Sequence, residues 1–285
     1  MALFRRKKSE DAADGTMSLM EHLYELRRRL SWAAAFIVVG TVIGFIWFSH
    51  GISAIGLKSL DEILIGPYCS AKQGQGCELL ATSPFAGISL QIKASLMAGL
   101  VFSSPGWLYE IWAFVTPALY SKEKRYAITF VSLAALLFTI GAVLAYAVIG
   151  EGLKVLMGFA SNAVNYQLGP TEYYSFLMTL LVVFGISFEL PLFLIALNFV
   201  GVVKGRQLAK WRRYAIFAMF VFAAMVVPGN DPITMLALAL AMTFLYEISV
   251  QVAKLHDKRK KNASAASDYS DLDDDVASPI SSEQA

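Results

Sequence analysis

The chain has 285 residues, of which 56% are hydrophobic and 16% are charged, and its mean hydropathy is +0.55. Soluble domains carry about 25% charged residues, so this composition excludes an ordinary soluble protein and predicts an integral membrane protein. The formal net charge of +2 says little about partners, because the charges are segregated along the chain.

Residues 1–17 are predicted to be a disordered, basic N-terminal arm. The cluster Arg5-Arg6-Lys7-Lys8 can touch anionic lipid, although a topology determinant is the plainer interpretation. We expect no cleavable signal peptide, since the first apolar run follows an amphipathic helix without a small-residue cleavage site.

A helix is predicted to begin at Ser18, which forms a capping box with Glu21. Its leucines share one face at helical spacing and its charges share the other, so we expect it to lie on the cytoplasmic membrane surface. On the charged face, Glu25 can pair with Arg29 at i,i+4, a contact worth about 0.2–0.5 kcal/mol. That pairing and a role in binding a ligand do not exclude each other.

The first span is predicted over residues 32–48, and residues 49–86 then form the longest polar connection. This connection holds Cys69 and Cys77, the only cysteines. The topology places it outside the cytoplasm, where disulfides persist, so we expect a Cys69–Cys77 bridge as a local staple. A metal site is not expected, because no second pair of ligands is nearby.

The second span is predicted over residues 88–111, with a kink at Pro105. Pro117 lacks a backbone N–H, so the helix before it is expected to end or kink near residue 116. Interfacial aromatics and cytoplasmic cations surround this connection: Trp112, Tyr120, Lys122, Lys124 and Arg125. An anchoring role explains all of these residues, but it does not explain the acid Glu123 among them.

The third and fourth spans are predicted over residues 126–149 and 173–200, joined by an outer connection over 150–170. Glu189, two residues before Pro191, is the one acid well inside a span. An ionisable group this deep in a membrane span usually has a function. The structural alternative is a protonated Glu189 that is hydrogen-bonded to a neighbouring helix. Gln91 and Lys93 of the second span are expected to face the same hollow, on weaker grounds.

The fifth apolar run, 214–227, follows the basic connection 201–213 and measures about 21 Å, short of a hydrocarbon core of about 30 Å. A tight turn over 228–232 leads to the sixth run, 233–252, so we expect the bilayer to thin around this hairpin. In the turn, Asp231 can cap the sixth helix. Residues 257–285 are predicted to be a disordered acidic tail after a six-helix membrane domain over 18–256.

The topology follows from the distribution of cations. With six spans and both termini in the cytoplasm, 20 of the 24 Lys and Arg residues lie on the cytoplasmic side. The positive-inside rule therefore supports this orientation. The predicted fold class is an all-α integral membrane protein with six transmembrane helices, the last two short.

The sequence lacks the catalytic residues and motifs that several classes of enzyme require. All three histidines lie outside the predicted spans, and no aspartate lies mid-span, so neither an intramembrane Ser–His protease nor a paired-aspartate protease is possible. The chain has no phosphate-binding loop and no metal-ligand cluster. We therefore expect a protein that is not an enzyme and needs no cofactor, metal or nucleic acid.

The two cytoplasmic acids Glu25 and Glu123 each lie among cations, which keeps them ionised near the interface. A carboxylate pairs well with the planar fork of an arginine, whereas lysine offers no fork. Together they suit a ligand with two adjacent arginines, and Phe114 can pack on the apolar residues of that ligand.

Four stretches resemble TatC, the membrane receptor of the twin-arginine protein translocase. They are His22-Leu-Tyr-Glu-Leu-Arg-Arg-Arg-Leu30, Trp112-Ala-Phe-Val-Thr-Pro-Ala-Leu-Tyr-Ser-Lys-Glu-Lys-Arg125, Ser187-Phe-Glu-Leu-Pro191 and the turn Pro228–Pro232. The resemblance covers about residues 18–256 and leaves the cysteine-bearing connection and both tails unmatched. It marks Glu25, Glu123, Glu189 and Asp231 as family positions.

The resemblance also implies a function and its partners. It implies a multi-pass protein of the bacterial cytoplasmic membrane that binds twin-arginine signal peptides of folded precursor proteins. It further implies work with the single-span subunits TatA and TatB, oligomerisation within a larger complex, and export driven by the proton-motive force. The use of the proton-motive force is carried over by the resemblance alone, since nothing in the spacing of the residues shows it.

Two other functions stay open. A small-solute or ion transporter would use Glu189 as a proton site, but it would need a second coupling group that the spans do not clearly show. A structural scaffold would leave Glu25 and Glu123 freely replaceable.

Overall fold

The computed structural model describes residues 19–49, 58–72, 79, 83–115, 124–158 and 169–270. Every regular element in these segments is a helix, which confirms the all-α prediction. By length and composition, four helices can each cross a membrane, and a bent pair of shorter helices makes a fifth candidate. The part of the chain described here therefore has four or five candidate spans, and the count of six stays a prediction.

Helix α1 (Leu19–Ser49) is a single 31-residue helix that includes both the amphipathic stretch and the first predicted span. We expected a surface helix followed by a span, but no break separates them. No Pro or Gly interrupts the chain until Gly40, so helical hydrogen bonding continues from one stretch to the other.

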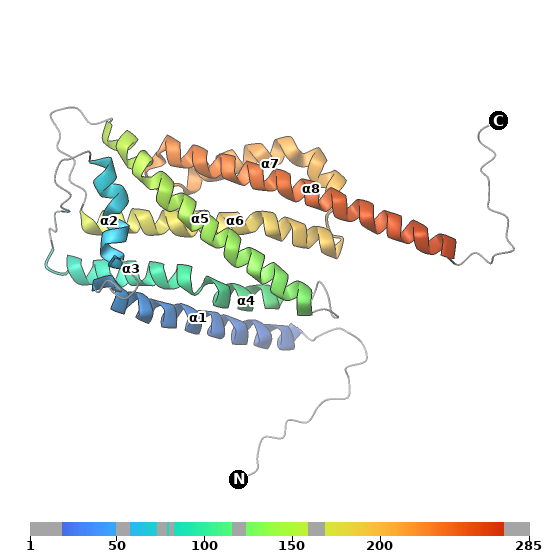
Figure 1. Cartoon of the computed structure of the whole chain (residues 1–285), viewed down its shortest axis with the longest axis horizontal. Helices are drawn as coiled ribbons and strands as arrows, with labels where there is room; N and C mark the ends of the chain where they lie inside the picture. Colours follow the sequence, from blue (N-terminus) through green and yellow to red (C-terminus); the bar gives the residue numbers. More distant parts are fainter. Residues whose placement is uncertain are drawn as a thin grey trace, which may run out of the picture.

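Helix α2 (Leu60–Ala71) was missed in the sequence, where this region was interpreted as a polar connection. Ser59 caps it by accepting a hydrogen bond from the Glu62 N–H at 3.3 Å. Leu60, Leu64 and Tyr68 recur at helical spacing and are buried against the bundle. The helix is too short to span a membrane, and it runs across the bundle axis at one end of the long helices (Figure 1).

Helices α3 (Ala86–Phe102) and α4 (Ser104–Val115) form the second predicted span, bent by 58°. This bend confirms the kink predicted at Pro105. At the break, side chains donate hydrogen bonds to backbone carbonyl oxygens. The Ser103 hydroxyl donates to the Gly99 oxygen at 2.6 Å, and the Trp107 indole N–H donates to the Leu100 oxygen at 2.9 Å. The break is therefore accommodated without unpaired backbone at these positions.

Helices α5 (Lys124–Gly158) and α6 (Pro170–Val200) are longer than the spans predicted for them. Residues 150–158, expected in an outer connection, continue α5, where Leu153 packs in the core. Helix α6 is followed by Gly201, whose φ of 86° forms a left-handed C-cap that favours glycine.

Helix α7 (Gly205–Val226) contains most of the basic stretch that we expected to be a connection. Its charged first half leaves an apolar part too short to pass as a span, in agreement with the predicted short fifth run. A single turn, η3 (Pro228–Asn230), has φ 79° at Gly229 and reverses the chain into α8.

Helix α8 (Pro232–Ser270) corrects the predicted boundary of the tail, because residues 257–270 continue the helix and are not an irregular segment. The lysines and alanines of this stretch are good helix formers, and no Pro or Gly interrupts them. Charge composition alone pointed to disorder, but local propensity and continuity with a long helix favour a helix here.

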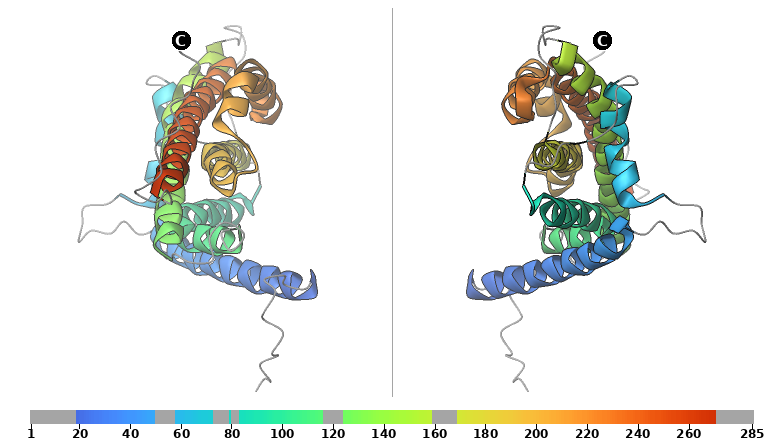
Figure 2. Two further views of the ribbon diagram at one scale, coloured as in Figure 1. Left: turned by 90° about the vertical axis from the view of Figure 1, so that its right-hand side faces the viewer. Right: turned by 90° about the vertical axis from the view of Figure 1, so that its left-hand side faces the viewer.

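The long helices run roughly along one axis and alternate in direction (Figure 1). Viewed along that axis, α1 and α7 lie at opposite edges with α6 between them (Figure 2). The main core joins α2, α3, α5, α6 and α8, and a second core joins α1, α4, α5 and α6. Within the described segments, the start of α1, the end of α4 and the start of α5 meet at one end of the bundle (Figure 1).

Candidate functional site

The candidate site lies where the first turns of α1 face the last turn of α4. The rings of His22 and Phe114 stack with centroids 4.6 Å apart and planes inclined by 28°. Glu25 lies one turn along α1 from His22, so the predicted residues Glu25 and Phe114 share one surface. The structure thus brings together two of the three residues predicted to bind a ligand.

Glu25 is held by arginines of its own helix. Its Oε1 accepts a bond from Arg28 at 2.8 Å and another from the Arg29 Nε at 2.7 Å. Its Oε2 has no hydrogen-bond partner among the described residues. The i,i+4 pair predicted from the sequence therefore exists, and half of the carboxylate stays open.

Glu110 is the residue of this site that the sequence interpretation missed. Its Oε2 lies 3.3 Å from Arg29 Nη1, so Arg29 bridges the carboxylates of α1 and α4. The side chains of Arg29 and Glu110 are only 20% and 15% exposed, whereas Arg28 is 65% exposed. A signal was present, because Glu110 precedes Phe114 by one helical turn and so shares its face.

Glu123 and Pro117 lie outside the described residues, as does most of the connection that contains them. Their predicted roles, in binding and in ending the helix, stay predictions. Glu123 immediately precedes Lys124, the first residue of α5, in the sequence.

Glu189 lies in the interior of α6, and both of its carboxylate oxygens are buried without a hydrogen-bond partner among the described residues. The Trp112 side chain of α4 lies close to this carboxyl, but no well-formed hydrogen bond joins them. Two residues on, the Pro191 oxygen accepts a bond from the Ser249 hydroxyl of α8 at 3.1 Å. Glu189 is therefore an unsatisfied polar group beside the junction of α4, α6 and α8.

Gln91 and Lys93 do not share a hollow with Glu189. The Gln91 amide points toward the Phe45 oxygen of α1, 3.4 Å away, and Lys93 donates to the Ser175 hydroxyl at 2.7 Å. Ser175 and Glu189 are 14 residues apart on α6, which places them about 21 Å apart along the helix. This corrects the expectation of a common intramembrane site.

The structure describes two further residues that were predicted to have structural roles, Asp231 and Cys69. Asp231 is fully buried and accepts bonds from the Ile233 and Thr234 N–H groups at 3.0 and 3.1 Å, the geometry of a helix cap. Cys69, near the end of α2, is disulfide-bonded. Cys77 lies outside the described residues, so the predicted bridge is seen only from its Cys69 end.

Comparison with known proteins identifies relatives over nearly the whole chain. The family model for the Sec-independent protein translocase protein (TatC) matches residues 21–240. The chain is 44% identical to the Sec-independent protein translocase protein TatC of Corynebacterium kroppenstedtii, over 96% of this chain and 70% of that protein. It is 38% identical to TatC of Aquifex aeolicus, over 88% of this chain and 100% of that protein.

A solved structure shows the same arrangement of helices. The crystal structure of a twin arginine translocase receptor, TatC, superposes with a TM-score of 0.66 at 37% identity. The superposition covers 82% of this chain and 98% of the other.

Proposed function

The chain belongs to the TatC family of Sec-independent protein translocase proteins, and we propose that it is the receptor and core subunit of its translocase. A TatC protein is a membrane component of protein transport and not an enzyme. In this proposal the chain spans the bacterial cytoplasmic membrane six times with both termini inside. It binds twin-arginine signal peptides and, with TatA and TatB, exports folded proteins using the proton-motive force.

The observation that carries the proposal is the half-open carboxylate of Glu25. One oxygen holds Arg28 and Arg29, and the other is available to a guanidinium from a ligand. The exposed Arg28 can also give up its place, while Arg29 stays between Glu25 and Glu110. A ligand arginine would form a charge-assisted bond there that a lysine could not reproduce as a fork.

The rest of the site suits the residues on either side of the arginine pair in such a peptide. The His22–Phe114 stack presents an aromatic surface beside Glu25, on which apolar residues of the peptide can pack. Glu123 precedes the start of α5 and would supply the second carboxylate. Glu189, with its unpaired buried carboxyl, would accept a polar group from the transmembrane helix of a partner.

The test is binding of a labelled twin-arginine signal peptide to the purified full chain in detergent. We would compare Arg-Arg and Lys-Lys peptides on the wild type and on Glu25→Gln and Glu123→Gln. We expect the wild type to prefer Arg-Arg by about 10- to 100-fold, and each variant to lose most of that preference, because a bond to a charged group contributes about 1.5–3 kcal/mol.

The matched control is Glu151→Gln. Glu151 also forms an i,i+3 ion pair, with Lys154 at 2.6 Å, but it lies toward the far end of α5. This variant should keep the wild-type preference. Equal binding of both peptides to all four proteins would refute the site, and solute uptake by vesicles containing this chain alone would favour the transporter instead.

A further inference from the structure

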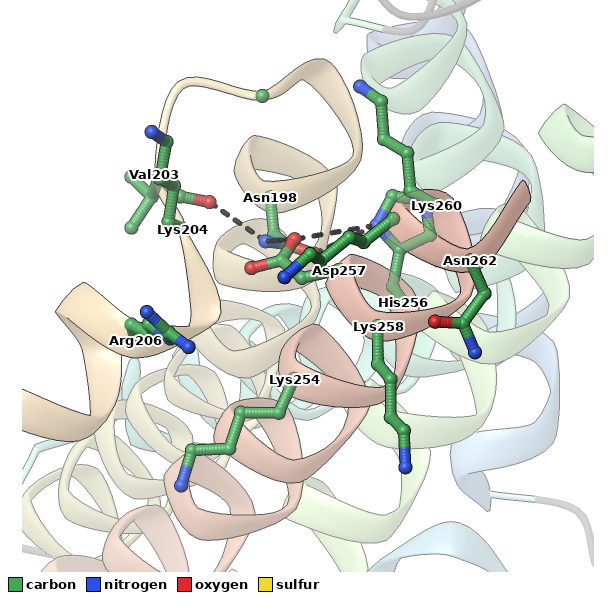
Figure 3. Close-up of a pocket in the computed structure, with 12 residues that line it drawn as sticks. Asn198, Val203, Lys204, Arg206, Lys254, His256, Asp257, Lys258, Lys260 and Asn262 are labelled. Carbon is green, nitrogen blue, oxygen red and sulfur yellow. Dashed lines mark hydrogen bonds and ion pairs between the residues drawn. The ribbon is translucent and has the colours of Figure 1, made fainter. Parts of the chain in front are cut away.

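A basic pocket lies where α6 ends, α7 begins and α8 leaves the bundle (Figure 3). Its volume is about 990 Å³. Five lysines and one arginine line it against a single aspartate, Asp257: Lys204, Arg206, Lys254, Lys258, Lys260 and Lys261. The twin-arginine site does not use these residues, which lie on different helices.

The single negative charge of Asp257 is outnumbered by these six cations, and both of its oxygens already accept hydrogen bonds from other groups. Asp257 Oδ1 accepts a bond from the Asn198 amide at 3.0 Å, and Oδ2 accepts one from the Gly205 N–H at 2.7 Å. Asn198 is almost fully buried, and its own oxygen lies 3.2 Å from His256 Nδ1. Asp257 therefore joins α8 to the end of α6, through Asn198, and to the start of α7, through Gly205. Figure 3 shows the contact between Asp257 and Asn198 at the centre of the pocket.

Five of the six cations around this anchor have no acidic partner in the part of the chain that the structure describes. Among the described residues, none of Lys204, Arg206, Lys254, Lys258 and Lys260 forms an ion pair with a carboxylate. Their mutual repulsion costs free energy, and an anion bound between them would relieve it. The pocket is thus built to hold a negative charge.

Apolar side chains next to the pocket indicate what kind of anion it suits. Val202 and Leu255 are 65% and 60% exposed, and the candidate span α6 ends at the exposed Val200 directly before the pocket. A free phosphate would leave these apolar groups without a partner. An amphiphile would place its headgroup among the cations and its acyl chains along the span.

We propose that this pocket binds the phosphate group of an anionic phospholipid at the predicted cytoplasmic surface. Arg206, Lys254 and Lys258 hold the phosphate oxygens, and Val200, Val202 and Leu255 contact the first methylenes of the acyl chains. Binding ties α8 to the junction of α6 and α7, where Asp257 already joins them.

The test uses the full chain in neutral detergent with phosphatidylglycerol that carries a fluorophore on one acyl chain. Binding is followed by energy transfer from the protein tryptophans, with acyl-labelled phosphatidylcholine as the neutral lipid. We expect phosphatidylglycerol to be preferred, and Lys254→Gln/Lys258→Gln to weaken its binding by about 10- to 30-fold. Lys254→Arg/Lys258→Arg should retain binding, which separates loss of charge from misfolding.

The control is Lys210→Gln/Arg213→Gln, which removes the same charge from exposed positions of α7 outside the pocket. It should weaken binding much less than the pocket variant does, because neither side chain lines the pocket. Equal losses in both double variants, or no preference over phosphatidylcholine, would overturn the proposal. Competition by inorganic phosphate as strong as that by short-chain phosphatidylglycerol would also overturn it, since the pocket would then select the anion and not the lipid.

Discussion

At the scale of single residues, the site depends on the different roles of two adjacent arginines. Arg28 and Arg29 both bond to Glu25, but only Arg29 also reaches Glu110 on another helix. Exposed ion pairs contribute little to stability, whereas a largely buried arginine shared by two carboxylates contributes more. The proposed binding site requires this difference, because Arg29 must stay in place while a ligand arginine displaces Arg28.

Arg29→Ala should therefore destabilise the protein by about 1–3 kcal/mol, because it leaves Glu25 and Glu110 without their shared partner. Arg28→Ala should change the free energy of unfolding by less than about 0.5 kcal/mol. Thermal unfolding of both variants in the same detergent would measure this difference. Equal destabilisation would mean that Arg29 does not join α1 to α4.

Tyrosine hydroxyls determine where α2 packs. The Tyr173 hydroxyl donates to the Leu64 oxygen at 2.7 Å, the Tyr146 hydroxyl donates to the Ile63 oxygen at 2.5 Å, and Tyr174 donates to Asp61 at 2.8 Å. These bonds reach α2 from α5 and α6. The short helix, which carries the disulfide-bonded Cys69, is thereby attached to the bundle by specific polar contacts.

Tyr173→Phe should cost about 0.5–1.5 kcal/mol, because it removes the buried hydrogen bond that joins α6 to the Leu64 oxygen of α2. Hydrogen exchange should become faster in residues 60–71, while the long helices stay protected. Tyr214→Phe is the control, since its side chain is 68% exposed, and it should behave as the wild type. Unchanged exchange in α2 would show that apolar packing alone holds it.

At the scale of elements, the close approach of α1 and α3 positions the start of α1. A Cβ built on Gly40 would lie 2.7 Å from the Gly99 oxygen, and a Cβ on Gly99 would overlap the Thr41 backbone. Small residues permit such contact between helices in a membrane. The crossing therefore determines how α1 lies against α4, and with it the distance from Glu25 to Phe114.

Gly99→Ala should destabilise the protein by about 1–3 kcal/mol, because the added methyl group forces the two backbones apart. It should also weaken binding of the Arg-Arg peptide, although Gly99 is remote from the site. Gly87→Ala, in the same helix, is the matched control, because nothing lies within 4 Å of its Cβ position. Similar behaviour of the two variants would contradict the role given to the crossing.

At the scale of the whole molecule, the alternating direction of the helices places the ends that we expect in the cytoplasm together (Figure 1). The start of α1, the end of α4 and the loop between α6 and α7 lie at one end of the bundle. The turn between α7 and α8 lies at the other end, with α2. This arrangement agrees with six passes, provided that α7 crosses a thinned bilayer.

A labelling experiment tests the six-pass topology. In a Cys69→Ser/Cys77→Ser background, Lys58→Cys should react with a membrane-impermeant maleimide added to intact cells. Val202→Cys should react only after the cells are opened, because its exposed side chain faces the cytoplasm in this topology. Labelling of Val202→Cys in intact cells would refute the predicted orientation.

The sequence by itself determined the apolar helices, the bend at Pro105 and the family, because these depend on composition, on a missing backbone N–H and on local motifs. It left open which polar groups meet across helices, since partners such as Arg29 and Glu110 are 81 residues apart in the sequence. It also missed α2 and the extension of α8, whose burial or continuity depends on neighbouring helices. Only the tertiary structure separated Gln91 from Glu189, placed Arg29 between two carboxylates and gathered the cations of two distant segments around Asp257. Each of these depends on how helices distant in the sequence pack together, which local pattern does not specify.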